Sequence, residues 1–128
     1  MITDDRRVRV FARAAPTDMR KSYDTLAALV TLELGREPTS GDLFLFVGAR
    51  LKNAKVLFWD GSGLCIFMKR LEKGRFAAPW KRSADGAISM SRAELSLFIE
   101  GSQLVFIGAL SPNEYEPKRV ATAALTVR

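Results

Sequence analysis

Two apolar runs separated by a short glycine-bearing turn dominate the middle of the chain. In order, these are an apolar run at residues 56–59, a turn at residues 60–63 and an apolar run at residues 64–68. This pattern predicts a β-hairpin, because glycine adopts positive φ angles in a tight turn without a Cβ clash. If Trp59 pairs with Leu64, successive side chains alternate between two faces that are both largely apolar. We therefore expect both faces to be covered at least in part, with Phe58 and Phe67 in the core.

Other segments also have strand patterns. Residues 7–13 alternate arginines with apolar residues, although Phe11 falls on the arginine side. Residues 43–47 are apolar throughout, which predicts a central strand that is buried on both faces. Residues 88–90 are compatible with a short strand, and residues 104–107 with either a strand or a buried extension.

Apolar residues recur at helical spacing over residues 19–34, which predicts a helix with one buried stripe. The members of this stripe are Met19, Tyr23, Leu26, Ala27, Val30 and Leu34. Thr17 or Asp18 is placed to cap the helix through a side-chain oxygen. Arg20 and Lys21 would then lie in the first turn, where the helix dipole mildly disfavours cations. Cations at this position suggest a use other than helix stability, and an ordinary solvated role is an equal alternative.

A second helix is predicted over residues 92–100, because Ser91 followed by Glu94 forms a capping-box pattern. The order of elements predicts an α+β fold with a mostly antiparallel sheet, a central β-hairpin and two helices. The 128 residues, of which 48% are hydrophobic, are enough for one compact domain. We expect that domain to cover residues 1–110, and residues 111–128 to form a mobile C-terminal tail.

Positive charge is concentrated in the middle of the chain. The net charge is +6, and residues 50–82 carry 9 basic and 2 acidic side chains. Residues 1–49 are balanced at 7 of each, and residues 83–128 carry 4 basic and 5 acidic side chains. A field concentrated in this way suits a polyanionic partner such as nucleic acid. The alternative, of equal weight, is a solvated surface that only keeps the protein in solution.

Basic and aromatic residues are interleaved after the hairpin, where Phe76 and Trp80 lie among lysines and arginines. Basic groups neutralise phosphates and aromatic rings can stack on bases, so this segment is a candidate DNA-binding surface. We expect it to meet the cations at the start of the first helix on one surface. Phe76 is more easily explained as a core residue. The candidate nucleic-acid-binding residues are Arg20, Lys21, Arg50, Lys52, Lys69, Arg70, Lys73, Arg75, Lys81 and Arg82.

The residue inventory argues against catalysis. The chain has no histidine, which removes the commonest general base and the commonest zinc ligand. Cys65 is the only cysteine and lies within an apolar run, so it is expected to be a small core residue. The aspartates have turn or cap positions and do not form a metal-binding pattern. No cofactor motif, signal peptide or membrane span is present, and we expect a cytoplasmic protein that is not an enzyme.

An ordered series of motifs between about Arg13 and Gly101 resembles a known family. These motifs are Asp18-Met19-Arg20-Lys21, Leu26 and Leu29, Gly41 with Leu43-Phe44-Leu45-Phe46, Lys55-Val56-Leu57 with Trp59-Asp60 and Gly63, Lys69-Arg70-Leu71-Glu72, Gly74-Arg75-Phe76 with Pro79, and Ser91-x-x-Glu94-Leu95. In this combination the chain resembles TnpB, the accessory transposition protein encoded by the second open reading frame of insertion-sequence-66 elements. Two departures from the family pattern are Ser22 in place of glycine and Ala77-Ala78-Pro79-Trp80 in place of a tryptophan-proline pair.

The resemblance implies a protein that supports transposition beside a separate transposase. The charge distribution adds the hypothesis that it binds DNA, at element ends or elsewhere, and contacts the transposase or other element-encoded proteins. A protein–protein adaptor of the transposase without its own affinity for DNA is the alternative. The segment after about Leu104 lies outside the resemblance.

Overall fold

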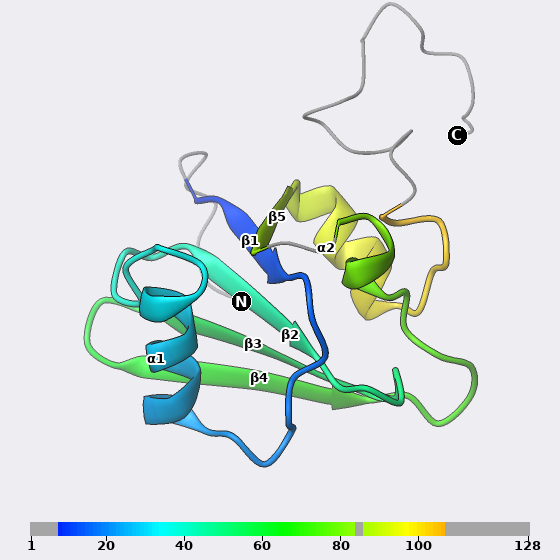
Figure 1. Cartoon of the computed structure of the whole chain (residues 1–128), viewed down its shortest axis with the longest axis horizontal. Helices are drawn as coiled ribbons and strands as arrows, with labels where there is room; N and C mark the ends of the chain where they lie inside the picture. The colour runs from blue at the N-terminus through cyan, green and yellow to red at the C-terminus, as the bar shows by residue number, and fades with distance from the viewer. Residues whose placement is uncertain (1–7, 84–85, 107–128) are drawn as a thin grey trace, which may run out of the picture.

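The computed structural model describes residues 8–83 and 86–106, which form a five-stranded sheet and two α-helices. In chain order the elements are β1 (Val10–Arg13), α1 (Tyr23–Leu32), β2 (Leu43–Val47), β3 (Asn53–Trp59), β4 (Leu64–Arg70), the 3₁₀-helix η1 (Pro79–Lys81), β5 (Ala87–Met90) and α2 (Arg92–Ile99). The strand order is β4-β3-β2-β1-β5 (Figure 1). Among the strand pairs of the described residues, only β1 and β2 run parallel. The prediction of an α+β fold with a mostly antiparallel sheet is therefore confirmed.

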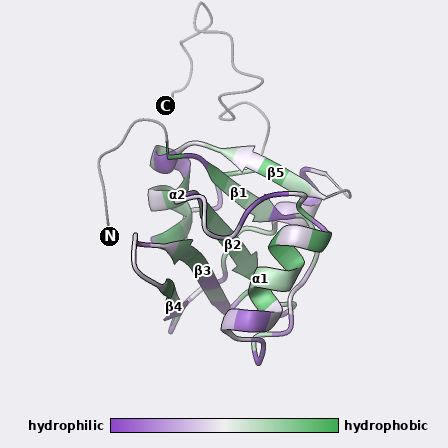
Figure 2. Ribbon diagram, turned by 90° about the vertical axis from the view of Figure 1, so that its left-hand side faces the viewer, coloured by the Kyte–Doolittle hydropathy of each residue, from purple (hydrophilic) through white to green (hydrophobic). Residues whose placement is uncertain are grey.

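Each face of the sheet carries one α-helix. On the face that we call the α1 face, Leu26 and Val30 of α1 are fully buried against the strands. On the opposite α2 face, Leu95 and Phe98 of α2 pack with η1 and residues 105–106. Figure 2 shows the strands lying between the two helices. Because β2 is the middle strand and all its residues are apolar, it is buried throughout, as predicted.

The β3–β4 hairpin has the predicted register, in which Trp59 pairs with Leu64. The turn between the strands is closed by the backbone N–H of Asp60, which donates to the carbonyl of Gly63 at 3.1 Å. The side chain of Asp60 also accepts hydrogen bonds from the backbone N–H groups of Ser62 and Gly63, at 2.9 and 3.0 Å. Asp60 therefore accepts from two backbone N–H groups of the turn. The turn in this way fixes the register of β3 against β4.

α1 is shorter than the sequence pattern predicts. The expected start at residue 19 with a Thr17 or Asp18 cap is wrong, because Ser22 is the N-cap residue. Thr17 is used differently: its backbone N–H donates to the carbonyl of Val47 at 2.9 Å and holds the chain against the end of β2. The segment before α1 is consequently a loop that follows the end of the sheet.

The hairpin contributes less to the core than expected. Phe58 is buried, but Phe67 is 40% exposed, so its assignment to the core is wrong. The reason is position in the sheet, because β4 is an edge strand and has a neighbouring strand on one side only. Tyr23, expected in the buried stripe of the first helix, is also exposed, at 47%.

The C-terminal part of the described chain follows the predictions more closely. The capping box is confirmed: the Ser91 side chain accepts from the backbone N–H of Glu94 at 3.0 Å, and the Glu94 side chain accepts in return from Ser91. After α2, residues 104–106 form no strand, and Phe106 packs edge-on against Phe98 with centroids 5.8 Å apart. This supports the buried extension for Val105 and Phe106, but Leu104 is 60% exposed. Residues 1–7 and 107–128, including the expected tail at 111–128, lie outside the described residues.

Candidate nucleic-acid interface

Three loops meet at the end of the sheet where β2 and β4 finish and β3 begins. They cover residues 14–22, 48–52 and 71–78. In Figure 1 the second and third loops lie at the lower right, and the first loop runs along the bottom of the view to α1. Backbone hydrogen bonds join them to the sheet and to one another. The N–H of Leu71 donates to the carbonyl of Lys52 at 2.8 Å, and the N–H of Phe76 donates to the carbonyl of Leu51 at 2.7 Å.

Most of the candidate DNA-binding residues are carried by these loops or by the last residue of β4. We call this set the basic end; its members are Arg20, Lys21, Arg50, Lys52, Arg70, Lys73 and Arg75. Asp18 and Glu72 are the acidic residues of the same segments. Five of the nine basic residues of segment 50–82 therefore lie at this end of the sheet, together with Arg20 and Lys21.

Arg20 is held by a carboxylate rather than by a helix. Its guanidinium bonds both oxygens of Asp18, with Nη2 to Oδ2 at 2.7 Å and Nε to Oδ1 at 3.0 Å. These hydrogen bonds keep the pKa of Asp18 well below its usual range, and the backbone N–H of Arg20 lowers it further. The side chain of Arg20 is still 91% exposed. The expectation that Arg20 and Lys21 lie in the first turn of the helix is wrong, since both precede Ser22.

Buried Lys55 links the loop before α1 to the hairpin. Its Nζ donates to the carbonyl of Lys21 at 2.7 Å, and its own neighbour in register is Met68 of β4. Arg70 lies two positions further along β4, so its side chain is on the same α1 face of the sheet. The loop that carries Arg20 and the end of β4 that carries Arg70 therefore lie on the same side of the sheet.

Lys52 and Arg70 of the basic end have different partners in the structure. Lys52 donates from Nζ to the carbonyl of Gly74 at 2.7 Å and so ties the second loop to the third. Arg70 pairs with Glu72 at 3.1 Å, with both side chains largely exposed. An exposed pair of this kind contributes little to stability.

Lys69, Lys81 and Arg82 are not brought to the basic end. Lys69 points to the α2 face and donates from Nζ to the carbonyl of Ile99 at 2.8 Å. Lys81 is the last residue of η1 and Arg82 follows it, and this helix packs with the core of the α2 face. The alternation of side chains along β4 predicts that Lys69 and Arg70 lie on opposite faces. The position of η1, and so of Lys81 and Arg82, could not be predicted from the sequence.

The two aromatic residues near the basic segment, Phe76 and Trp80, both pack against the core of the α2 face. Phe76 is fully buried and stacks on Phe98 at 4.7 Å between centroids, which confirms its role as a core residue. Trp80 is half-buried against the same core. The interpretation that these rings interleave with cations on one surface is therefore wrong for Phe76.

A small hollow lies between the first and second loops of the basic end. It has a volume of about 270 Å³, and its lining includes Asp18, Met19, Gly48, Arg50 and Lys52. A Cβ atom at Gly48 would approach Cγ of Met19 to 2.9 Å, so glycine is needed for this contact. The sequence pattern placed Met19 in a helical stripe and gave no sign that it meets Gly48.

Three aspartates of the described chain have structural partners. Buried Asp42 accepts from the backbone N–H of Arg9 at 3.0 Å, Asp60 closes the hairpin turn, and Asp18 binds Arg20. Within residues 8–83 and 86–106, no group of three His, Cys, Asp or Glu side chains is placed to hold a metal ion. Burial raises the pKa of the half-buried Cys65 thiol, which disfavours the nucleophilic thiolate. No helix in the described ranges is long and apolar enough to cross a membrane.

The described residues form a small α+β fold in which the loops at one end of the sheet and the last residue of β4 carry seven cations. Comparison with known proteins gives the family: the chain belongs to the IS66 Orf2-like proteins, whose family model, TnpB_IS66, matches residues 8–107. This places it among the accessory proteins of insertion sequences. Two relatives come from Sinorhizobium fredii (strain NBRC 101917 / NGR234). Uncharacterized protein y4hO is 40% identical and uncharacterized protein y4jC 38% identical, each over 101 residues. These matches cover 79% of this chain and 86% and 85% of the relatives. No solved structure matches the chain.

Proposed function

We propose that this accessory protein binds the DNA of its insertion sequence through the phosphates that contact the basic end. The observation that supports the proposal is the gathering of seven cations from three loops and a strand end, beside two acidic residues, at one end of the sheet. Cations so grouped raise the local concentration of a polyanion and release its counterions on binding.

Duplex DNA fits this surface better than single-stranded DNA does. Proteins that bind single strands combine cations with exposed aromatic rings on which the bases stack. Here Phe76 is buried and Trp80 is half-buried, so the nearby rings are used by the core. A basic surface without such rings favours contacts to the backbone of a duplex, which are largely independent of sequence.

The proposal also includes a protein partner, the transposase, and a location on the DNA and in the cell. Bound near the element ends in the cytoplasm, the protein would assist the separate transposase that cuts and joins the strands. An adaptor that contacts the transposase without affinity for DNA is the alternative, and a DNA-binding measurement separates the two.

The test is a titration of binding against salt, with a duplex from the element end and a random duplex of equal length. Each neutralised phosphate contributes about −0.9 to the slope of log K against log salt concentration. Changing both Lys73 and Arg75 to Ala should therefore flatten the slope by about two units and weaken binding to both duplexes alike. Both side chains are exposed, so their removal should leave the fold intact.

The charge-matched control changes Lys118 and Arg119 to Ala, and a second control changes Lys81, which lies outside the basic end. Both controls should keep the slope close to that of the unchanged protein. An unchanged protein without salt-dependent DNA binding would favour the adaptor. A slope that responds to Lys118 and Arg119 but not to Lys73 and Arg75 would exclude the basic end.

A further inference from the structure

The edge strand β4 is long and apolar. It has 7 residues, and among the described residues it pairs with β3 alone. Its charged residues, Lys69 and Arg70, come only at its end, and it contains no proline. The opposite edge strand, β5, has 4 residues. Proteins usually protect an edge by making it short, charged or interrupted, because its free backbone groups are a template for another strand. Residues 64–68 have none of these protections.

The backbone groups that β4 presents outward can be identified. The N–H of Asp60 donates to the carbonyl of Gly63, and the N–H of Leu71 donates to the carbonyl of Lys52, so both pairs are of the hydrogen-bonded type. Such pairs alternate with non-hydrogen-bonded pairs along an antiparallel ladder. Odd-numbered residues of β4 therefore bond to β3. The N–H and C=O groups that point away from the sheet belong to Leu64, Ile66, Met68 and Arg70.

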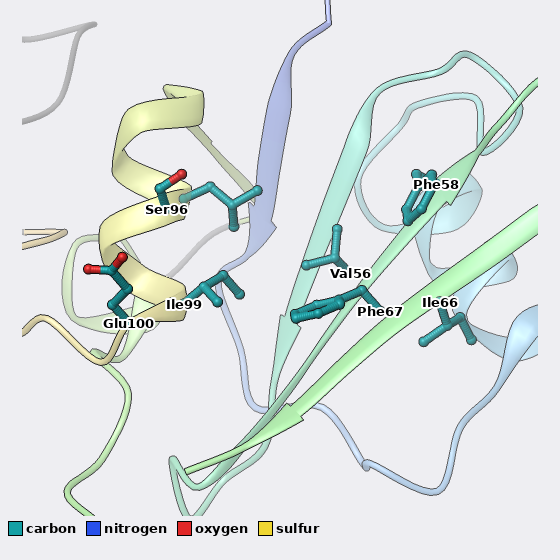
Figure 3. A pocket seen from close by; sticks show the side chains of 8 residues that line it. Val56, Phe58, Ile66, Phe67, Ser96, Ile99 and Glu100 are labelled. Atoms are coloured by element: carbon teal, nitrogen blue, oxygen red, sulfur yellow. The ribbon is translucent and has the colours of Figure 1, made fainter. Parts of the chain in front are cut away.

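The same edge exposes apolar side chains beside a groove. Phe67 is 40% exposed on the α2 face, and Met68 is 52% exposed on the α1 face. The groove has a volume of about 580 Å³ and runs between the hairpin and α2. Figure 3 shows Phe67 pointing from β4 towards Ile99 of α2, with space between the two side chains.

We propose that β4 pairs antiparallel with β4 of a second copy of this chain, about a two-fold axis that passes between the two Phe67 residues. This register pairs all seven residues of both strands, with Leu64 opposite Arg70 and Ile66 opposite Met68. Both of these pairs join outward-facing backbone groups, as hydrogen-bonded pairs require. Phe67 then faces its own copy in a non-hydrogen-bonded pair, where side chains approach most closely.

Charge complementarity favours a second copy as the occupant of this edge. In the antiparallel register, the cationic ends of the two strands lie far apart, so like charges do not meet. Arg70 of each copy lies opposite Leu64 of the other, beside the turn that carries ionised Asp60. Lys69 is directed to the carbonyl of Ile99 and does not face the partner strand. An apolar centre with opposite charges at each end is complementary to itself under two-fold symmetry.

The register is tested by disulfide formation without DNA in the sample, so that its result is independent of the proposed function. In a Cys65→Ser background, Phe67→Cys places two thiols at the axis, where Cα atoms about 4.5 Å apart are within disulfide reach. We expect mild oxidation to link most of this variant into dimers. Leu97→Cys in the same background is the matched control, because Leu97 is 42% exposed but lies on α2. The unchanged protein is a second control, because its two Cys65 residues would be about 13 Å apart.

A proline substitution tests the pairing by sedimentation. Proline is tolerated on an edge strand where its missing N–H would face away from the sheet. Met68→Pro should therefore leave the fold intact by circular dichroism and convert a dimer of the unchanged protein into a monomer. Met68→Ala is the control, because it keeps the backbone donor and should remain dimeric.

The proposal is overturned if the unchanged protein sediments as a monomer at all concentrations, or if Leu97→Cys links as readily as Phe67→Cys. It is also overturned if Phe67→Cys forms disulfide-linked dimers only after residues 107–128 have been removed. In that case the chain's own C-terminal segment occupies β4.

Discussion

At the scale of single residues, the fold decides what each charge does. Arg20 and Lys69 are both cations from the candidate set, but Arg20 is presented to solvent by Asp18 while Lys69 is directed to the end of α2. Lys69 and its neighbour Arg70 also lie on opposite faces of the sheet, because the side chains of a strand alternate between faces. The count of charges therefore overstates the number available to a ligand.

The Asp18–Arg20 pair can be tested through the pKa of the carboxyl group. Arg20→Ala should raise the pKa of Asp18 towards its ordinary value, because the side-chain hydrogen bonds from Arg20 are the largest cause of the shift. Lys21→Ala should move it much less, since the Lys21 charge is the smallest cause. Carboxyl carbon NMR during a pH titration measures both variants.

The sign of the effect on stability follows from linkage. A carboxyl whose pKa is lowered in the folded state adds stability above its unfolded pKa, and this contribution is lost as the pH falls through the folded value. For Asp18 the loss is therefore expected below about pH 4. An Asp18 pKa that stays low in Arg20→Ala would contradict the assignment of its cause.

The different burial of two phenylalanines gives a stability prediction. Phe44→Ala should cost about 3–5 kcal/mol of unfolding free energy, because Phe44 is fully buried in β2. Phe67→Ala should cost about 1–2 kcal/mol, because much of its ring already contacts water. Urea unfolding at low protein concentration provides the comparison. Equal losses from the two changes would show that Phe67 is buried in solution.

At the scale of elements, α2 is held at both ends. The capping box of Ser91 and Glu94 satisfies its first N–H groups, and Lys69 of β4 bonds the carbonyl of Ile99 at the other end. A cation there also interacts favourably with the negative end of the helix dipole. Lys69 therefore joins the edge strand to the helix that covers the α2 face.

Removal of this tie should loosen α2 without affecting DNA binding. Lys69→Met keeps the length of the side chain but removes the donor, and we expect a loss of about 1–2 kcal/mol. Hydrogen exchange should become faster near the end of α2. Lys73→Met is the matched control, because Lys73 is exposed, and it should change stability by less than about 0.5 kcal/mol. A salt slope of DNA binding that flattens in Lys69→Met as much as in Lys73→Met would assign Lys69 to the interface instead.

Local chemistry explains which elements could be predicted from the sequence. The register of the hairpin depends on a short turn and two adjacent runs, and the start of α2 depends on Ser91 and Glu94, so both were predictable. The start of α1 was not, because the apolar Met19 fits a helical stripe but in fact meets Gly48 of a distant loop. The exposure of Phe67 was also hidden, since it depends on which strand forms the edge.

At the scale of the whole molecule, the basic end depends on the order of the strands. The sequence indicated two clusters of cations, at residues 20–21 and 69–75, and the hypothesis that they meet needed the chain to return to the same end of the sheet. Lys81 and Arg82 lie close to the second cluster in the sequence, but η1 carries them to the α2 face. Only the tertiary arrangement separates these two groups.

The position of β1 between β2 and β5 has a consequence for the order in which the chain assembles. β2, β3 and β4 are joined by short connections, so their ladders form with little loss of chain entropy. β1 instead pairs Val10 with Leu43 and with Met90, contacts that close long loops and form slowly. During synthesis β1 leaves the ribosome before the other described strands, but its second partner, β5, emerges only after β2, β3 and β4 have been made. Of the described strands, the first to be translated is thus the last to be enclosed, and until β5 arrives β1 itself forms an edge of the sheet.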